Sequence, residues 1–165
     1  MFDVLVYVYE NYWHGDTCPE LSRLERKLSA VGFESDEIRE ALNWLDDLTL
    51  ATQGTQWHYA RPEPGSAPTL THPQSSQSLR VYSVAEQNHL GASCLGFISF
   101  LESSGVLPSS MREIVIDRTM SVPQEEVTLD KLKIIILMVY WSLDQEPDAL
   151  VLDELSDNRS ERIAH

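Results

Sequence analysis

The stretch TLDKLKIIILMVYWSL, residues 128–143, predicts the helix around which this protein folds. Apolar residues recur in it every three or four positions, which is the spacing of one helical face, at Leu129, Leu132, Ile136, Val139 and Leu143. Further apolar residues widen this face, namely Ile134, Ile135, Met138 and Trp141. Because a helix that is hydrophobic nearly all round is buried, we expect this helix, which begins at Thr128, to be the central one.

Two more helices are expected just before it in the chain. Ser83 and Glu86 have the spacing of a capping box, in which each side chain bonds the backbone N–H of the other residue. The helix that they start carries one apolar face, formed by Leu90, Cys94, Phe97, Ile98 and Leu101. Ser110 and Glu113 repeat the capping-box spacing and predict a shorter helix through about Met120. The preceding LRVY, residues 79–82, is interpreted as a short strand.

A segment rich in proline and serine divides the chain. RPEPGSAPTLTHPQSSQS, residues 61–78, holds four prolines and four serines without apolar periodicity, which is typical of a linker. It separates an N-terminal module, residues 1–60, from a second helical module, residues 79–145. An acidic C-terminal tail, residues 146–165, follows.

The N-terminal module is predicted to hold three helices. FDVLVYVYENYW is predicted to form the first, because Leu5, Val8, Tyr9 and Tyr12 share one helical face; its β-branched residues would also suit a strand. Thr17 and Glu20 have capping-box spacing before the second, which ends at Gly32, and the third begins near Ser35. TQGTQWHYA, residues 52–60, is expected to form a hairpin around Gly54. Three helices followed by a hairpin are the order of a winged helix, so the fold class is mainly α, with a winged-helix-like module and a second helical module.

The charge of the chain argues against direct binding to nucleic acid. Twelve Lys and Arg residues stand against 26 Asp and Glu residues, a formal net charge of −14, and affinity for phosphate backbones comes largely from Lys and Arg. The third helix, SDEIREALNWLDDL, carries five acidic residues and one arginine. Direct nucleic-acid binding by the winged-helix-like module is therefore the alternative and protein binding the first hypothesis.

No motif predicts a catalytic, cofactor or metal site. Cys94 lies on an apolar helical face, where a free cysteine acts as a small hydrophobe. Cys18 precedes a predicted helix start, where the helix dipole favours a thiolate, and is the candidate for a reactive thiol; the alternative is an incidental, partly exposed cysteine. Two cysteines and scattered histidines do not have metal-ligand spacing. The N-terminus lacks a basic leader, and IIILMVYW, residues 134–141, falls short of the ~20 apolar residues that span a membrane. We expect a cytoplasmic protein without enzymatic activity.

Several segments together resemble the Smg family of proteobacterial proteins, across residues 1–60 and 79–143. These are MFDVLVYVYENY, GFESDEIREALNWLDDL, LGASCLGFISFLESSGVL, MREIVIDRTMSV and LDKLKIIILMVYW. The resemblance implies no catalytic residues, since the family has no established activity. Genes of this family often lie beside genes for DNA processing, so the resemblance implies a cellular setting for the protein and not a mechanism.

Residues 24–45, LERKLSAVGFESDEIREALNWL, also resemble one repeat of the RecX recombination regulators. The shared pattern is a helix, a Gly-Phe turn and a second amphipathic helix, and it is carried by Leu24, Leu28, Gly32, Phe33, Ile38, Ala41, Leu42 and Leu45. Because those regulators bind a protein filament, this resemblance implies contact between proteins.

The function predicted from the sequence is a regulatory adaptor that binds an unknown protein, for example one that processes nucleic acid. Trp44 and Trp57 are candidate anchors, because tryptophan is enriched among interface hot spots; the alternative is that Trp44 closes the core. Four cations are candidates for a local basic patch, namely Arg112, Arg118, Lys131 and Lys133. Their alternative role is pairing with Glu113, Asp117 and Asp130 on the same helices.

Overall fold

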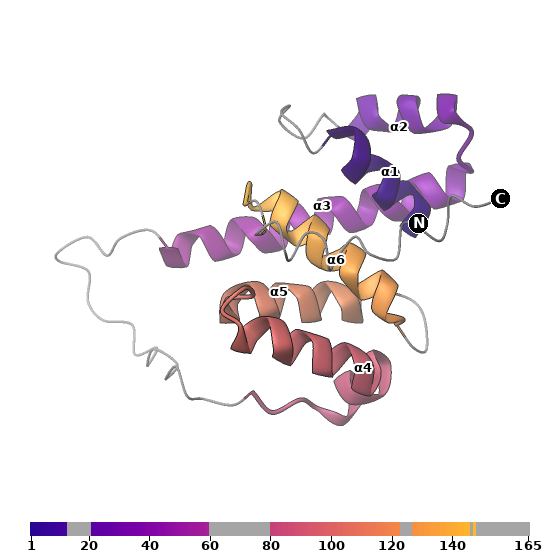
Figure 1. Cartoon of the computed structure of the whole chain (residues 1–165). Coiled ribbons are helices and arrows are strands. Elements are labelled where there is room, and N and C mark those ends of the chain that lie inside the picture. Colours follow the sequence, from indigo (N-terminus) through magenta and orange to yellow (C-terminus); the bar gives the residue numbers. More distant parts are fainter. Residues whose placement is uncertain (13–20, 60–79, 123–126, 146, 148–165) are drawn as a thin grey trace.

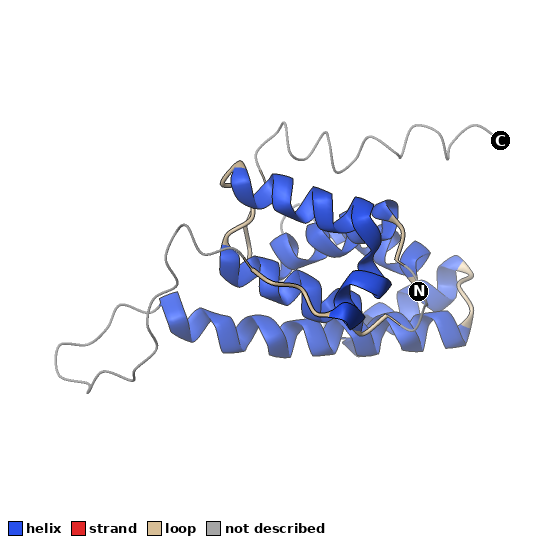
Figure 2. Ribbon diagram, turned by 90° about the horizontal axis from the view of Figure 1, so that it is seen from below, coloured by secondary structure: helices blue, strands red, loops and turns tan. Residues whose placement is uncertain are grey.

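A computed structural model describes residues 1–12, 21–59, 80–122, 127–145 and 147, except for the side chains of residues 54–59. These residues form six helices and, within the described ranges, no strand (Figures 1 and 2). The helices are α1 (Phe2–Tyr12), α2 (Leu21–Val31), α3 (Ser35–Tyr59), α4 (Val84–Ser103), α5 (Ser109–Met120) and α6 (Leu129–Ser142). The mainly α class predicted from the sequence is confirmed.

Helix α6 is the centre of the structure, as its all-round hydrophobicity predicts. It packs against α1, α3, α4 and α5 (Figure 1). Leu132, Ile136 and Val139 are fully buried. The first turn is capped as expected, because the Thr128 side chain accepts a hydrogen bond from the backbone N–H of Lys131, at 3.4 Å.

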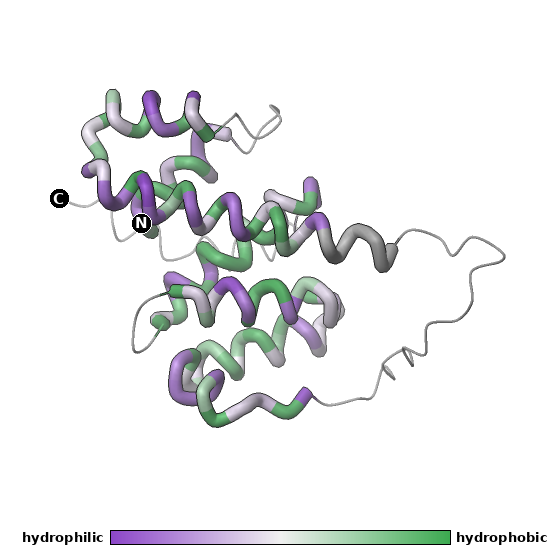
Figure 3. Tube along the Cα trace, turned by 180° about the vertical axis from the view of Figure 1, so that it is seen from behind, coloured by the Kyte–Doolittle hydropathy of each residue, from purple (hydrophilic) through white to green (hydrophobic). Residues whose placement is uncertain are grey.

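The buried side chains of all six helices belong to one hydrophobic cluster. Figure 3 shows hydrophobic and hydrophilic positions alternating along α3, which is the pattern of a helix with one face on the core. The cluster joins residues on both sides of the proposed linker, 61–78, which itself lies outside the described residues. The predicted domain boundaries therefore stay a prediction.

The turn between α2 and α3 needs a glycine. Gly32 has φ +109°, a conformation that residues with a Cβ rarely adopt, and its N–H bonds the Leu28 carbonyl at 3.2 Å. The predicted end of this helix is confirmed. The capping box expected at Thr17 and Glu20 lies outside the described residues.

The predicted wing is wrong, because α3 does not end near Leu48. It continues as one helix to Tyr59 and takes in residues 52–59, where a hairpin around Gly54 was expected. Gly54 is a common turn residue, but glycine is tolerated inside a helix at a cost of about 1 kcal/mol relative to alanine. The N-terminal helices are therefore not followed by a β-hairpin over these residues.

Helix α4 begins as predicted and then bends. Ser83 and Glu86 form the capping box, with the Glu86 N–H bonding Ser83 Oγ at 3.2 Å and the Ser83 N–H bonding Glu86 Oε2 at 2.7 Å. Gly91, with φ 67° and ψ 168°, interrupts the helix. The strand expected at residues 79–82 is not present over the described residues 80–82. Instead, the chain there is held by the side chain of Arg80.

Helix α5 does not use the predicted capping box. It starts at Ser109, after Pro108 as N-cap, and no side chain caps it. Glu113, the expected partner of Ser110, instead accepts hydrogen bonds from Arg80 and Arg112. An arginine and a carboxylate carry opposite charges and can bond through two N–H groups at once. Glu113 therefore binds Arg80, 33 positions away, and the adjacent Arg112 rather than the backbone N–H of Ser110.

Candidate interaction surfaces

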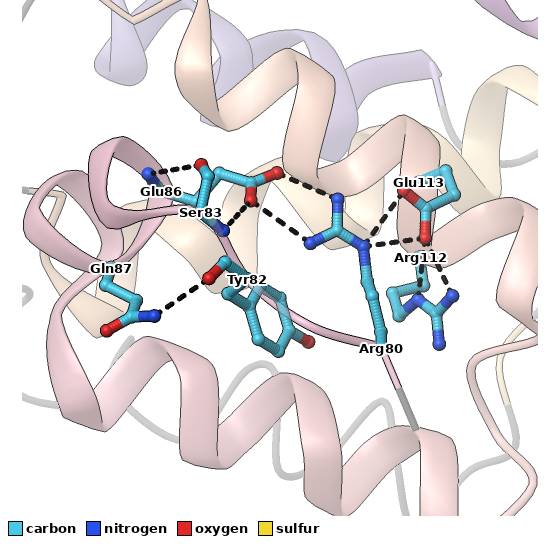
Figure 4. A network of polar contacts seen from close by, with 7 residues as sticks. All are labelled: Arg80, Tyr82, Ser83, Glu86, Gln87, Arg112 and Glu113. Atoms are coloured by element: carbon cyan, nitrogen blue, oxygen red, sulfur yellow. Dashed lines mark hydrogen bonds and ion pairs between the residues drawn. The ribbon is translucent and has the colours of Figure 1, made fainter. Parts of the chain in front are cut away.

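Arg80 holds the start of α4 against α5 (Figure 4). Its Nη2 donates to Glu86 Oε1 at 2.8 Å, and its Nε donates to Glu113 Oε1 at 2.9 Å. The guanidinium carbon also lies 4.7 Å from the centroid of the Tyr82 ring, within cation–π range. One side chain therefore fixes the entry of the chain into α4.

This arrangement keeps both carboxylates ionised. The hydrogen bond from Arg80, together with the bond from the Ser83 backbone, lowers the pKa of Glu86 to about 2. Burial opposes ionisation of Glu113, but the hydrogen bonds from Arg80 and Arg112 outweigh burial and lower its pKa. The same two carboxylates raise the pKa of Arg80. A general acid needs the opposite shift, toward a raised pKa.

Arg112, a predicted partner-binding residue, is almost fully buried. Its side chain is 3% exposed and lies between Glu102 and Glu113, with 2.7 Å between Nη2 and Glu113 Oε1. The predicted alternative, pairing with Glu113 on the same helix, is what the structure shows for this residue. Arg112 therefore contributes to the contact between α4 and α5.

Trp44 and Arg118 lie together where α3 packs on α5. Trp44 is 5% exposed and donates its indole N–H to the Arg118 carbonyl at 3.2 Å. The Arg118 guanidinium bonds Asp117 Oδ2 at 2.7 Å and lies 3.6 Å from Asp47 Oδ2. Trp44 thus closes the core, as its alternative interpretation predicts, and Arg118 is engaged by carboxylates of two helices.

The two candidate lysines of α6 face aromatic rings. Lys133 is 6% exposed, with Nζ 5.5 Å from the centroid of Phe97. Lys131 Nζ lies 5.4 Å from the centroid of Phe2. Because Arg112 and Lys133 are buried, the four candidate cations do not form one exposed patch, and a role for them in partner binding stays a prediction.

Cys94 is part of the core, as expected. Its exposure is 1%, and its thiol donates to the Val127 carbonyl at 3.2 Å, while the Val127 N–H bonds the His89 carbonyl at 2.9 Å. Cys18 lies outside the described residues. Over the residues that are described, no three His, Cys, Asp or Glu side chains are grouped to hold a metal ion, and no helix is long and apolar enough to cross a membrane.

The outer face of α3 is acidic around one exposed apolar side chain. Glu40, Asp46 and Asp47 are exposed, and Leu50 is 61% exposed. The nearby Arg39 donates a hydrogen bond to Asp36 at 2.7 Å, so the positive charge of Arg39 is compensated by that carboxylate. We call the residues Asp36, Glu40, Asp46, Asp47 and Leu50 the α3 face.

The outer face of α2 carries cations that the sequence analysis did not single out. Arg23, Arg26 and Lys27 are exposed, whereas Leu24 and Leu28 of the same helix are fully buried. The signal was present in LSRLERKL, residues 21–28, where the cations fall at positions i, i+3 and i+4. A sum over the whole chain does not reveal it, because 26 Asp and Glu residues outnumber 12 Lys and Arg residues.

These features define a helical protein with an acidic face and a basic face on neighbouring helices. All 165 residues match a family described as "Protein of unknown function (DUF494)". Over the full length of both chains, the protein is 54% identical to the Protein Smg homolog of Leptothrix cholodnii, 53% to that of Methylibium petroleiphilum and 43% to that of Bordetella pertussis. The chain belongs to the Smg family, as its motifs predict. No solved structure matches it.

Proposed function

We propose that this protein is a non-enzymatic cytoplasmic adaptor that binds another protein through the α3 face. The observation that carries the proposal is Leu50, a large apolar side chain 61% exposed beside Asp46 and Asp47. An apolar contact with a charged rim is the usual composition of a protein interface. The charge favours a partner with a basic surface, such as a protein that processes nucleic acid, because complementary charge steers the encounter.

Trp57 is included in the proposal as a second contact. It stands seven residues after Leu50 in α3, which brings its backbone to nearly the same angular position on the helix. Its side chain lies outside the described part of the structure. Trp57 thereby keeps the role that the sequence predicts for it.

Two observations favour an adaptor over an enzyme. Glu86 and Glu113 have lowered pKa values because arginines bind them, and Cys94 is buried with its thiol bonded to a carbonyl. These groups are therefore engaged in holding the fold. Direct binding of the α3 face to nucleic acid is disfavoured, since phosphates repel its carboxylates.

The test is capture of the tagged full-length protein from its native cytosol, with and without nuclease. Leu50→Ser removes the exposed apolar contact, and Phe100→Ser on α4, where Phe100 is 58% exposed, is the matched control. We expect a stoichiometric protein that survives nuclease, is lost with Leu50→Ser and is kept with Phe100→Ser. Equal capture by both variants contradicts the proposal. If the captured proteins are no longer recovered after nuclease treatment, the result supports nucleic-acid binding instead.

A further inference from the structure

Helix α2 lies at the edge of the structure (Figure 1), and its exposed side chains include three cations. Its buried residues are Leu24 and Leu28, and it packs mainly on α3. Arg23, Arg26 and Lys27 are exposed and, within the described part of the chain, form no ion pair. By contrast, the other described arginines are bonded to carboxylates, namely Arg39, Arg80, Arg112 and Arg118. We call Arg23, Arg26 and Lys27 the α2 face.

Two contacts orient the cations of this face. Lys27 Nζ lies 5.1 Å from the centroid of the Tyr12 ring, within cation–π range. Arg26 Nε donates to the Ser22 carbonyl, one helical turn earlier, at 3.4 Å. Because side chains held in place lose less conformational entropy on binding, the α2 face is partly organised for a ligand before contact.

The size of the face limits what it can recognise. The cations lie within five consecutive residues of helix, a rise of about 6 Å from the first to the last at 1.5 Å per residue. That length matches two or three carboxylates of a short peptide. A nucleic acid carries charge continuously, about one per 1.7 Å of duplex, and the following residues Glu34, Asp36 and Glu37 would repel a backbone that extended beyond α2.

We propose that the α2 face binds a short acidic segment of a partner protein. The proposal goes beyond the function assigned to the α3 face, because it concerns another helix and the opposite charge. Guanidinium and ammonium groups would each pair with a carboxylate of the segment. An adaptor with both faces would hold a basic surface on α3 and an acidic segment on α2.

The experiment titrates full-length ¹⁵N-labelled protein with a twelve-residue poly-L-glutamate peptide at low salt and follows the backbone amides by NMR. We expect saturable shifts concentrated on α2 and a Kd that rises with salt. Arg23→Gln/Arg26→Gln/Lys27→Gln should weaken binding about tenfold, the effect of losing several exposed ion pairs. Arg39→Gln, at an exposed arginine already paired with Asp36, is the control and should leave the Kd unchanged.

Three results would overturn the proposal: shifts that avoid α2, a triple variant with undiminished affinity, or a thymidine dodecanucleotide that binds α2 more tightly than the peptide. Amides outside α2 report whether the triple variant is folded, and Arg26→Gln alone replaces it if it is not. Leu50→Ser should leave peptide binding intact. Failure of the peptide test and failure of the capture test are thereby separate outcomes.

Discussion

Trp44 on α3 donates its indole N–H to the backbone carbonyl of Arg118 on α5, with 3.2 Å between nitrogen and oxygen. The two residues are 74 positions apart and lie on opposite sides of the segment 60–79. The same carbonyl accepts a second hydrogen bond, from Ser121 Oγ at 2.8 Å. The contact therefore fastens the N-terminal helices to the C-terminal ones at a carbonyl that keeps one partner if the indole is removed.

Replacing Trp44 separates its packing from its hydrogen bond. Trp44→Phe keeps an aromatic ring and should lower the free energy of unfolding by about 1 kcal/mol, since Ser121 still satisfies the carbonyl. Trp44→Ala also leaves a cavity and should cost about 3–5 kcal/mol. Urea denaturation followed by circular dichroism measures both, and equal losses in the two variants would contradict this division.

Gly91 and Gly96, both in α4, should respond to alanine in opposite directions. Gly91 has φ 67° and ψ 168°, a region almost restricted to glycine, so Gly91→Ala should destabilise the protein by about 1–3 kcal/mol. A Cβ on Gly96 would meet nothing within 4 Å. Gly96→Ala should stabilise it by about 0.5–1 kcal/mol. The melting temperatures of the two variants test whether α4 bends at Gly91, because both substitutions would be stabilising in a straight helix.

The stability of the protein should fall in acid because of Glu86. Its pKa is lowered from the usual value of 4.5 to about 2 in the folded state. The stabilisation is therefore complete above about pH 4.5 and is lost as the pH falls toward 2. Unfolding free energies measured across this range should decline less steeply in Glu86→Gln than in the unaltered protein. Glu25→Gln, at an exposed glutamate of α2 outside this network, is the control for the substitution itself.

Arg112 and its carboxylates should differ in the cost of their removal. Arg112 is 3% exposed, whereas Glu102 and Glu113 are 34% and 49% exposed. Glu102→Gln/Glu113→Gln leaves a buried cation without a counter-ion and should cost about 3 kcal/mol. Arg112→Met leaves carboxylates that water can reach and should cost less. The hydrogen bond between Arg80 and Glu86 remains in both variants. Chemical denaturation that ranks the two variants the other way would be inconsistent with a buried Arg112.

The parts of the fold that depend on neighbouring residues could be predicted from the sequence. The apolar spacing around Ile136 indicates a buried helix, and the capping box of Ser83 and Glu86 closes within one turn. The end of α2 at Gly32 follows from the preference of glycine for positive φ. In each case the pattern that predicts the feature lies within one helix or one turn of the chain.

The parts that depend on distant contacts could not be predicted. Glu113 is taken by Arg80, 33 positions away, so the pattern at Ser110 is not used. The bend at Gly91 lies beside the backbone hydrogen bond from Val127 to His89, and no pattern in the neighbouring sequence predicts that bond. Arg112 and Lys133 were expected in an exposed basic patch, but both are buried. Their burial is set by how the helices pack.

The opposite charges of α2 and α3 give the molecule a local electric dipole across two packed helices. A charged surface that approaches exerts a torque on this dipole and turns the protein before any side chain touches it. These two adjacent helices thereby contribute to the orientation of the protein as it meets a charged surface, in addition to the effect of the strongly negative net charge of the whole chain.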